Sequence, residues 1–127
     1  MTAVAQPLIY VRDVPTSSAW YCAVLGATSG HGGDEYERIS FGEDFVMQLH
    51  AWDDDHHHGT PGDATKPVGN GLLLWFAVDD FDAAVARAET LGAAIHTAPH
   101  VNPNAQQWEV WLRDPDGYIV VVAGPPM

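Results

Sequence analysis

Hydrophobic and polar residues alternate in short stretches along this chain, and turn-forming residues separate the stretches. The clearest example runs from Gln107 to Ala123, where β-forming residues flank Asp114-Pro115-Asp116-Gly117 on both sides. Asp, Pro and Gly stand there at the positions that they prefer in a β-turn. Because Val, Ile, Tyr and Trp favour pleated strands, this stretch predicts a β-hairpin.

The first half of the chain predicts one helix among several strands. The segment from Arg12 to Pro15 breaks the first strand, after which Thr16, Ser17 and Ser18 offer hydroxyl groups to cap a helix. Gly26 would end this helix. Strands are predicted at Gln6–Val11, Tyr36–Phe41 and Phe45–Trp52, with a further one near 27–29. The predicted order is β-α-β-β-β.

The second half predicts the same order. Leu72–Val78 is apolar on both faces, which is typical of a central strand. A helix follows, capped within Asp79–Asp82 and ended by Gly92, with Arg87 and Glu89 on its solvent side. Its apolar face consists of Phe81, Ala84, Val85, Ala88 and Leu91. A short strand at Ala93–Thr97, a loop over 98–106 and the hairpin complete this half.

The two halves share their spacing as well as their order. Asp13 stands 13 residues before Gly26, and Asp79 stands 13 residues before Gly92. Both helices would end in Leu-Gly-Ala. The first half has one residue more than the second between its first strand and its predicted helix. An internal repeat of this kind predicts two similar units that bury a face against each other. We expect a single domain with module one at 5–52, a linker at 53–70 and module two at 71–124.

Composition narrows the classes of partner. The chain has 17 Asp and Glu against 5 Lys and Arg, a formal net charge of -12, so phosphate backbones would be repelled and nucleic acid is excluded as a partner. An acidic surface either attracts a cationic ligand or simply keeps the protein soluble. Since no run of 18 apolar residues occurs, we expect no membrane span. A single cysteine, Cys22, and a start without signal-peptide character favour the cytoplasm.

The motifs together resemble the vicinal oxygen chelate superfamily, which includes glyoxalase I, extradiol dioxygenases, fosfomycin-resistance enzymes and bleomycin-resistance proteins. The resemblance rests on Val11-x-Asp13, on Phe76-Ala-Val-Asp-Asp and on Asp-Pro-Asp-Gly-Tyr118, each near a predicted strand or helix. It implies an α+β fold in which two βαβββ modules form a cup-shaped mixed sheet. It also implies a homodimer that completes the cup.

Enzymes of that superfamily hold a divalent metal with side chains from four strands. The resemblance places these positions at Gln6, Gln48, Leu73 and Val121. Leucine and valine side chains have no donor atom, and two neutral amides suit Zn, Ni, Mn or Fe poorly. We therefore expect neither a metal nor another cofactor.

The same strands offer aromatic and polar surface. Counting in steps of two from the metal positions, and adding the face that Glu109 and Trp111 share, predicts one ligand-binding set. It comprises Leu8, Tyr10, Gln48, His50, Trp52, Leu73, Trp75, Glu109 and Trp111. The rings could stack on a flat ligand or attract a cation, and Glu109 could pair with an amine. Alternatively, any one tryptophan fills the core.

Three functions remain open from the sequence. The first is a metal-free protein that sequesters a planar and in some cases cationic drug or natural product, as the bleomycin-resistance branch implies. The second is a metal-dependent glyoxalase- or dioxygenase-like enzyme, and the third is a metal-free enzyme that uses His50 and Glu109 as an acid–base pair. The run His56-His57-His58 could bind a metal or form a solvated loop. Cys22 is most simply an inert buried thiol.

Overall fold

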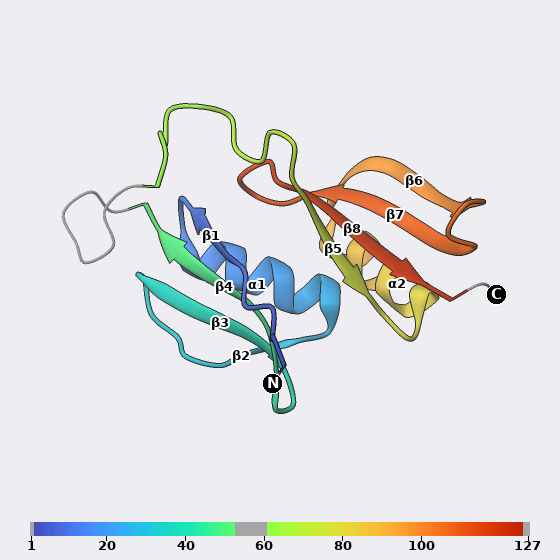
Figure 1. Ribbon diagram of the computed structural model, residues 1–127, viewed down its shortest axis with the longest axis horizontal. Helices are drawn as coiled ribbons and strands as arrows, with labels where there is room; N and C mark the ends of the chain where they lie inside the picture. Colours follow the sequence, from blue (N-terminus) through green and yellow to red (C-terminus); the bar gives the residue numbers. More distant parts are fainter. Residues whose placement is uncertain (1, 53–60, 126–127) are drawn as a thin grey trace.

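Two four-stranded mixed sheets, each backed by one helix, make up the fold (Figure 1). The computed structural model describes residues 2–52 and 61–125. The first sheet has the order β1-β4-β3-β2 and the second the order β5-β8-β7-β6. The first module contains β1 (Leu8–Val11), α1 (Val14–Leu25), β2 (Thr28–Ser29), β3 (Tyr36–Phe41) and β4 (Asp44–Ala51). The second contains β5 (Leu73–Ala77), α2 (Phe81–Leu91), β6 (Ala94–Asn102), β7 (Gln107–Arg113) and β8 (Ile119–Gly124).

The two modules have the same topology, which confirms the predicted pair of βαβββ units. β1 pairs in parallel with β4, and β5 pairs in parallel with β8, while all other pairs are antiparallel. Asp13 and Asp80 are the N-caps of the two helices, and Gly26 and Gly92 end them with positive φ. Since α1 has 12 residues and α2 has 11, the extra residue of the first module lies inside its helix and not before it.

The start of α1 differs from the prediction. The helix begins at Val14 after the N-cap Asp13, with Pro15 in its first turn, and Ser17 and Ser18 are buried within it. Proline suits the first turn because the N–H that it lacks would have no partner in the helix there. The segment that looked like a strand breaker is therefore a helix start.

Three predictions for the second module are wrong. β5 is an edge strand of its sheet and not a central one. β6 continues to Asn102, through the stretch predicted as a loop, because Pro99 is tolerated in an edge strand. Arg87 does not point to solvent: its Nε donates to the carbonyl of Val24 at 3.1 Å and joins α2 to the end of α1. The hairpin of β7 and β8 and the Asp80 cap, whose side chain accepts from the Ala83 amide at 3.0 Å, are confirmed.

Side chains of the Asp-Pro-Asp-Gly-Tyr turn join the modules. Asp114 is buried, and its Oδ1 accepts the amide N–H groups of residues 116–118, each at 2.9 Å. Its Oδ2 accepts the Tyr21 hydroxyl of α1 at 2.6 Å. The Tyr118 hydroxyl donates to the carbonyl of Tyr10 at 2.9 Å, and Arg12 forms an ion pair with Asp116 at 3.0 Å. The turn thus holds β1, α1 and the connection between them against the second module.

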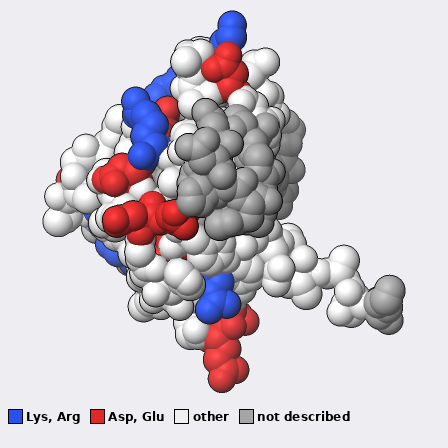
Figure 2. Space-filling model, turned by 90° about the vertical axis from the view of Figure 1, so that its left-hand side faces the viewer, with Lys and Arg blue, Asp and Glu red and all other residues white. Residues whose placement is uncertain are grey.

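The acidic charge is distributed over the surface. On the face in Figure 2, acidic side chains lie in several separate groups with Lys and Arg between some of them. Within residues 2–52 and 61–125, no helix has the length and apolar character needed to cross a membrane.

Candidate ligand-binding faces

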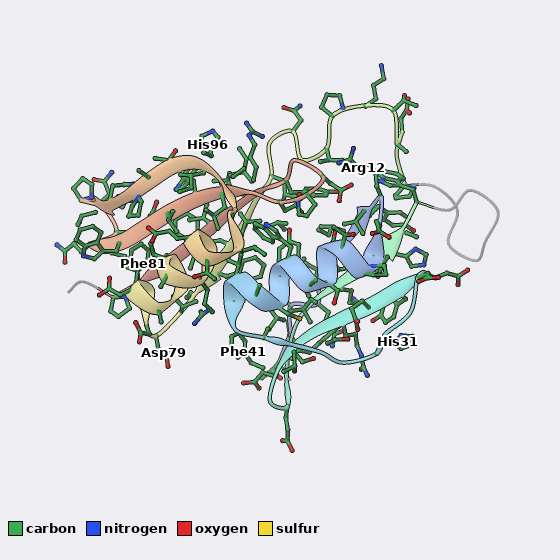
Figure 3. The ribbon with its side chains drawn as sticks, turned by 180° about the vertical axis from the view of Figure 1, so that it is seen from behind. Arg12, His31, Phe41, Asp79, Phe81 and His96 are labelled. Carbon is green, nitrogen blue, oxygen red and sulfur yellow. The ribbon has the colours of Figure 1, made fainter. Side chains whose placement is uncertain are left out.

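Each sheet has one face covered by a helix and one face that no helix of the described residues covers. The helices lie together on one side of the molecule, and Figure 3 shows them in front of the sheets. Side chains alternate along a strand, so every second residue is directed away from the helix. We call the faces opposite α1 and α2 the first and the second open face. The first carries Leu8, Tyr10, Tyr36, Arg38, Gln48 and His50, and the second carries Leu73, Trp75, Glu109, Trp111 and Val121.

Aromatic rings gather on the first open face. Tyr10 lies opposite His50 in the β1–β4 register, and their ring centroids are 5.1 Å apart in a stacked arrangement. Trp52 follows β4 and lies 5.1 Å from the Tyr10 ring. Tyr36 meets His50 edge to face, and Leu8 is 38% exposed. Five residues of the predicted ligand-binding set, Gln48 among them, therefore lie together in this module.

Gln48 is held by neighbours on both sides of its amide. Its Oε1 accepts the Tyr36 hydroxyl at 2.6 Å, and its Nε2 donates to the backbone carbonyl of Gln6 at 3.0 Å. The side chain of Gln6 precedes β1 and is exposed. The amide oxygen of Gln48 is thus already engaged within the protein.

The second open face presents a row of three side chains. Trp75 on β5, Val121 on β8 and Trp111 on β7 are directly opposite one another in the register. Two strand spacings separate the tryptophans, or about 10 Å. Trp75 is 46% exposed, Leu73 beside it is 41% exposed, and Val121 is fully buried. Four predicted residues are therefore brought together here, but on an open surface and not in an enclosed pocket.

Glu109 is buried on this face among hydrogen-bond donors. Glu109 is 1% exposed, and its Oε1 accepts the indole N–H of Trp111 at 3.0 Å. Its Oε2 accepts the Asn102 amide at 2.8 Å, and the Nε2 of His100 lies 3.7 Å from Oε1. Direct contact with a ligand amine, as predicted from the sequence, would require these neighbours to move.

Sequence reasoning missed the contribution of β6 to this face. His100 and Asn102 lie beside Glu109, and the imidazole of His96 stacks on Trp111 with centroids 5.7 Å apart. The predicted loop over 98–106 hid this, since only a strand would align these residues with β7. Alternation of His96, Ala98 and His100 was the available signal, but Pro99 favoured a loop.

A second buried glutamate, Glu37, was also missed. It lies on the helix side of β3 and accepts hydrogen bonds from Ser29 and from the amides of His31, Gly32 and Arg38. Burial by itself would raise the pKa of Glu37, but these hydrogen bonds outweigh it and lower the pKa to about 2. The carboxylate thereby anchors the segment between β2 and β3, which lines a cavity of about 430 Å³ with Tyr36 and His50.

The four family metal positions do not fit a metal ion. Leu73 and Val121 have no donor atom, and the oxygen of Gln48 accepts a hydrogen bond from Tyr36. In the described parts of the chain, no three His, Cys, Asp or Glu side chains come together as a metal site. The sequence expectation for His56-His57-His58 lies outside the described residues. The side chains at these four positions therefore do not supply an adequate set of metal ligands.

The predicted acid–base pair is divided between the modules. His50 lies in the first sheet, where its Nδ1 is 2.8 Å from the carbonyl of Ala51, and Glu109 lies in the second sheet. Cys22 is half-buried on α1, and burial raises its thiol pKa, which disfavours a nucleophilic thiolate. Neither arrangement supports an activated group in the single chain.

Two βαβββ modules with open, aromatic sheet faces define a class of fold shared by binding proteins and enzymes. Residues 3–122 match the profile of the Glyoxalase/Bleomycin resistance protein/Dioxygenase superfamily, and the chain belongs to this superfamily. The chain is 32% identical over 116 residues to the uncharacterized protein YaeR of Escherichia coli K12, a match that covers 86% of this chain and 85% of YaeR.

Solved structures share the fold at low sequence identity. Lactoylglutathione lyase from Agrobacterium tumefaciens has a TM-score of 0.71 at 23% identity, covering 98% of this chain and 94% of that one. The fosfomycin resistance protein FosX from Mesorhizobium loti has a TM-score of 0.69 at 13% identity, covering 100% of this chain and 95% of that one. At these identities the likeness is one of fold.

Proposed function

We propose that this protein binds a small, planar, positively charged organic molecule without a metal, as a sequestering protein of the antibiotic-resistance type. The observation that carries the proposal is the pair Trp75 and Trp111 on an open sheet face, beside the buried carboxylate of Glu109. Exposed aromatic rings bind flat ligands by stacking and attract cations through their faces. The net charge of -12 favours a cation over an anion.

A homodimer would close the open faces. The edge strands β1 and β5 each pair on one side only, and the apolar side chains of Leu8, Leu73 and Trp75 near these edges are between 38% and 46% exposed. Large exposed apolar side chains on adjacent positions are typical of protein–protein or ligand-binding surfaces. A second copy would supply the opposite wall that one chain lacks, and its rings would complete the site.

The chemistry of the site favours binding over turnover. The family metal positions offer no adequate donor set, and His50 and Glu109 lie on different sheets. On the second open face, Leu73, Trp75, Trp111 and Val121 lie beside the polar group of Glu109, His100 and Asn102. Burial and stacking on the apolar and aromatic side chains would contribute most of the affinity.

Fluorescence titration of the tryptophans with a panel of planar cations and planar neutral rings tests this function. We expect saturable quenching by flat cations, and the ligand should be recovered unchanged after prolonged incubation. Conversion of the ligand would instead show an enzyme, and the absence of quenching by any planar compound would contradict the proposal.

A further inference from the structure

The contacts of Glu109 and Trp111 carry an inference about ligand selectivity that rests on the proposed function. The indole N–H of Trp111 donates to the Glu109 carboxylate at 3.0 Å. His96 of β6 stacks on the same indole, with an interplanar angle of 28°. Figure 3 shows His96 on the outer strand of the second sheet, away from the helices. The Trp111 ring is therefore fixed at its N–H edge and covered from the β6 side.

The remaining indole face is the one available to a ligand. β7 lies between β6 and β8, so a ring covered from the β6 side presents its other face toward β8 and β5. Trp75 stands on β5 in the same row. Trp75 has no corresponding hydrogen bond among the described contacts and is 46% exposed. The Trp111 ring is thus held in place, and the Trp75 ring is freer to adjust.

The carboxylate also changes the electronic character of the fixed ring. A hydrogen bond from an indole N–H to an ionised acceptor is charge-assisted, and it polarises the donor toward the acceptor. Electron density on the ring rises as a result, and the attraction of the ring face for a cation rises with it. Because Glu109 is 1% exposed and both of its carboxylate oxygens have hydrogen-bond partners, a ligand cannot readily reach the carboxylate itself.

We propose that Glu109 is a specificity-determining residue that acts through Trp111, and that the pair selects flat aromatic cations whose charge needs no N–H group. A direct ion pair would instead require a hydrogen-bond donor on the ligand. A ring with a quaternary nitrogen has no such donor. Its charge would instead be attracted by the face of the indole and by the electric field of the buried carboxylate. The ligand class is therefore an N-alkylated heteroaromatic cation.

Calorimetric titration of the full-length protein with N-methylquinolinium and with neutral methylquinoline tests this at one fixed pH. The two probes have the same flat shape and differ in charge. We expect the parent protein to bind the cation about 2- to 30-fold more tightly, the range of a cation–π contact. Glu109→Gln should bring this ratio toward one while leaving the affinity for methylquinoline nearly unchanged.

Further variants separate this role from a structural one. Trp111→Phe keeps a ring but removes the N–H, so it should also lower the ratio, which tests the proposal independently if Glu109→Gln unfolds. Trp108→Phe should keep the ratio, because Trp108 lies on the helix side of β7, with its ring 6.0 Å from that of Phe81. His100→Gln should keep the ratio as well, and that result would show that the imidazole 3.7 Å from Glu109 is not the source of selectivity.

Three outcomes would overturn the proposal. Equal affinity of the parent for both probes would overturn the selectivity alone and leave the proposed binding function in place. An unchanged ratio in both folded variants, Glu109→Gln and Trp111→Phe, would show that the pair does not set it. Binding of neither probe by the parent would overturn the proposed function and this inference together.

Discussion

Two buried carboxylates of this protein are stabilised by different groups and therefore serve different purposes. Glu37 accepts a hydrogen bond from Ser29 and three from backbone amides, two of which lie in the segment between β2 and β3 that it anchors. Glu109 accepts them from the side chains of Trp111 and Asn102 on an open face. Backbone donors are held by the fold, whereas side-chain donors can be displaced or re-aimed. Glu37 consequently determines local stability, and Glu109 determines the geometry of side chains on the second open face.

Removal of the Trp111 ring tests the second open face directly. Trp111→Ala should weaken binding of a planar cation by about 1–3 kcal/mol, the scale of an interface hot spot, because stacking area is lost. Trp75→Ala should weaken it as well. Isothermal titration measures the affinity, and circular dichroism checks the fold.

Trp108 provides the matched control for these variants. It lies on the helix side of β7, where its ring is 6.0 Å from that of Phe81. Trp108→Phe should therefore leave binding unchanged. If the two open-face variants bind like the parent, or if both simply unfold, the rings belong to the core and the ligand site lies elsewhere.

The low pKa of Glu37 predicts a loss of stability in acid. Its pKa is about 2 in the folded protein against 4.5 in the free side chain, so the folded state favours the carboxylate. The resulting stability is fully present above pH 4.5 and is lost as the pH falls toward 2. We expect this group to contribute roughly 1–3 kcal/mol to the free energy of unfolding.

Urea unfolding as a function of pH, for the parent and for Glu37→Gln, measures this contribution. The variant should be less stable at neutral pH, and its disadvantage should shrink as the pH falls through the same window. A constant difference between the two proteins across that window would contradict the assignment.

At the scale of elements, the turn between β7 and β8 also acts as the joint between modules. Asp114 closes its own turn with one oxygen and accepts the Tyr21 hydroxyl of α1 with the other. Burial raises the pKa of Asp114 and, with the nearby Asp114 charge, raises that of Tyr21. The same residues that favour a hairpin thus also set how the second module meets the first.

The Tyr118 hydroxyl makes the contact between the modules sensitive to alkaline pH. Burial, together with the charges of Asp114 and Asp116, raises the pKa of Tyr118 to about 12 from 10.0 in the free phenol. Its neutral form therefore contributes stability that is present below pH 10.0 and is lost as the pH rises toward 12. We expect the loss to be roughly 1–3 kcal/mol.

Thermal unfolding in this range, with Tyr118→Phe as the comparison, measures the effect. The variant lacks the hydroxyl that donates to Tyr10, so it should begin less stable and lose less as the pH rises. A parallel decline of both proteins would assign the alkaline loss to other groups, such as Tyr21.

At the scale of the whole molecule, the separation of the two open faces is the dominant feature. The helices α1 and α2 pack together, and each sheet keeps two edge strands that pair on one side only and one face that no helix covers. His31 near the first sheet and His96 on the second lie toward opposite ends in Figure 3. A site that uses both faces would therefore need surfaces from two chains.

A homodimer is the expected solution state for this reason. The chain has a mass of 13.8 kDa, and light scattering at micromolar concentration should give twice this mass. Leu8→Lys places a charge at the edge of the first open face and should shift the protein toward monomers, because burial of an unpaired charge opposes association. A Lys substitution at exposed Glu89 is the matched surface control. A monomeric parent would contradict the expectation.

Metal analysis addresses the whole chain, including the histidine run outside the described residues. After incubation with zinc, nickel or manganese and then with a chelator, we expect no stoichiometric metal, because the four family positions lack adequate donors. A triple alanine variant of His56, His57 and His58 serves as the control. One tightly held metal per chain that persists in this variant would contradict the prediction.

The sequence by itself determined the elements, the repeat and the family of this protein. Strand alternation, the Gly26 and Gly92 helix ends and the Asp-Pro-Asp-Gly turn are local signals, and local chemistry decides them. Alternation also placed Trp75 and Trp111 on faces that the structure brings into one row. Element ends were less predictable: Pro15 starts α1 and Pro99 lies within β6, because proline is tolerated in a first helical turn and in an edge strand.

Only the tertiary structure decided which elements are edges and which polar groups meet. An apolar strand such as β5 has the same composition whether it is central or uncovered, so its place at the edge depends on pairing across the chain. The partners of Glu109 come from β6 and β7, and those of Asp114 come from α1 and its own turn. Contacts between residues far apart in sequence arise from register and packing, and no local pattern specifies them.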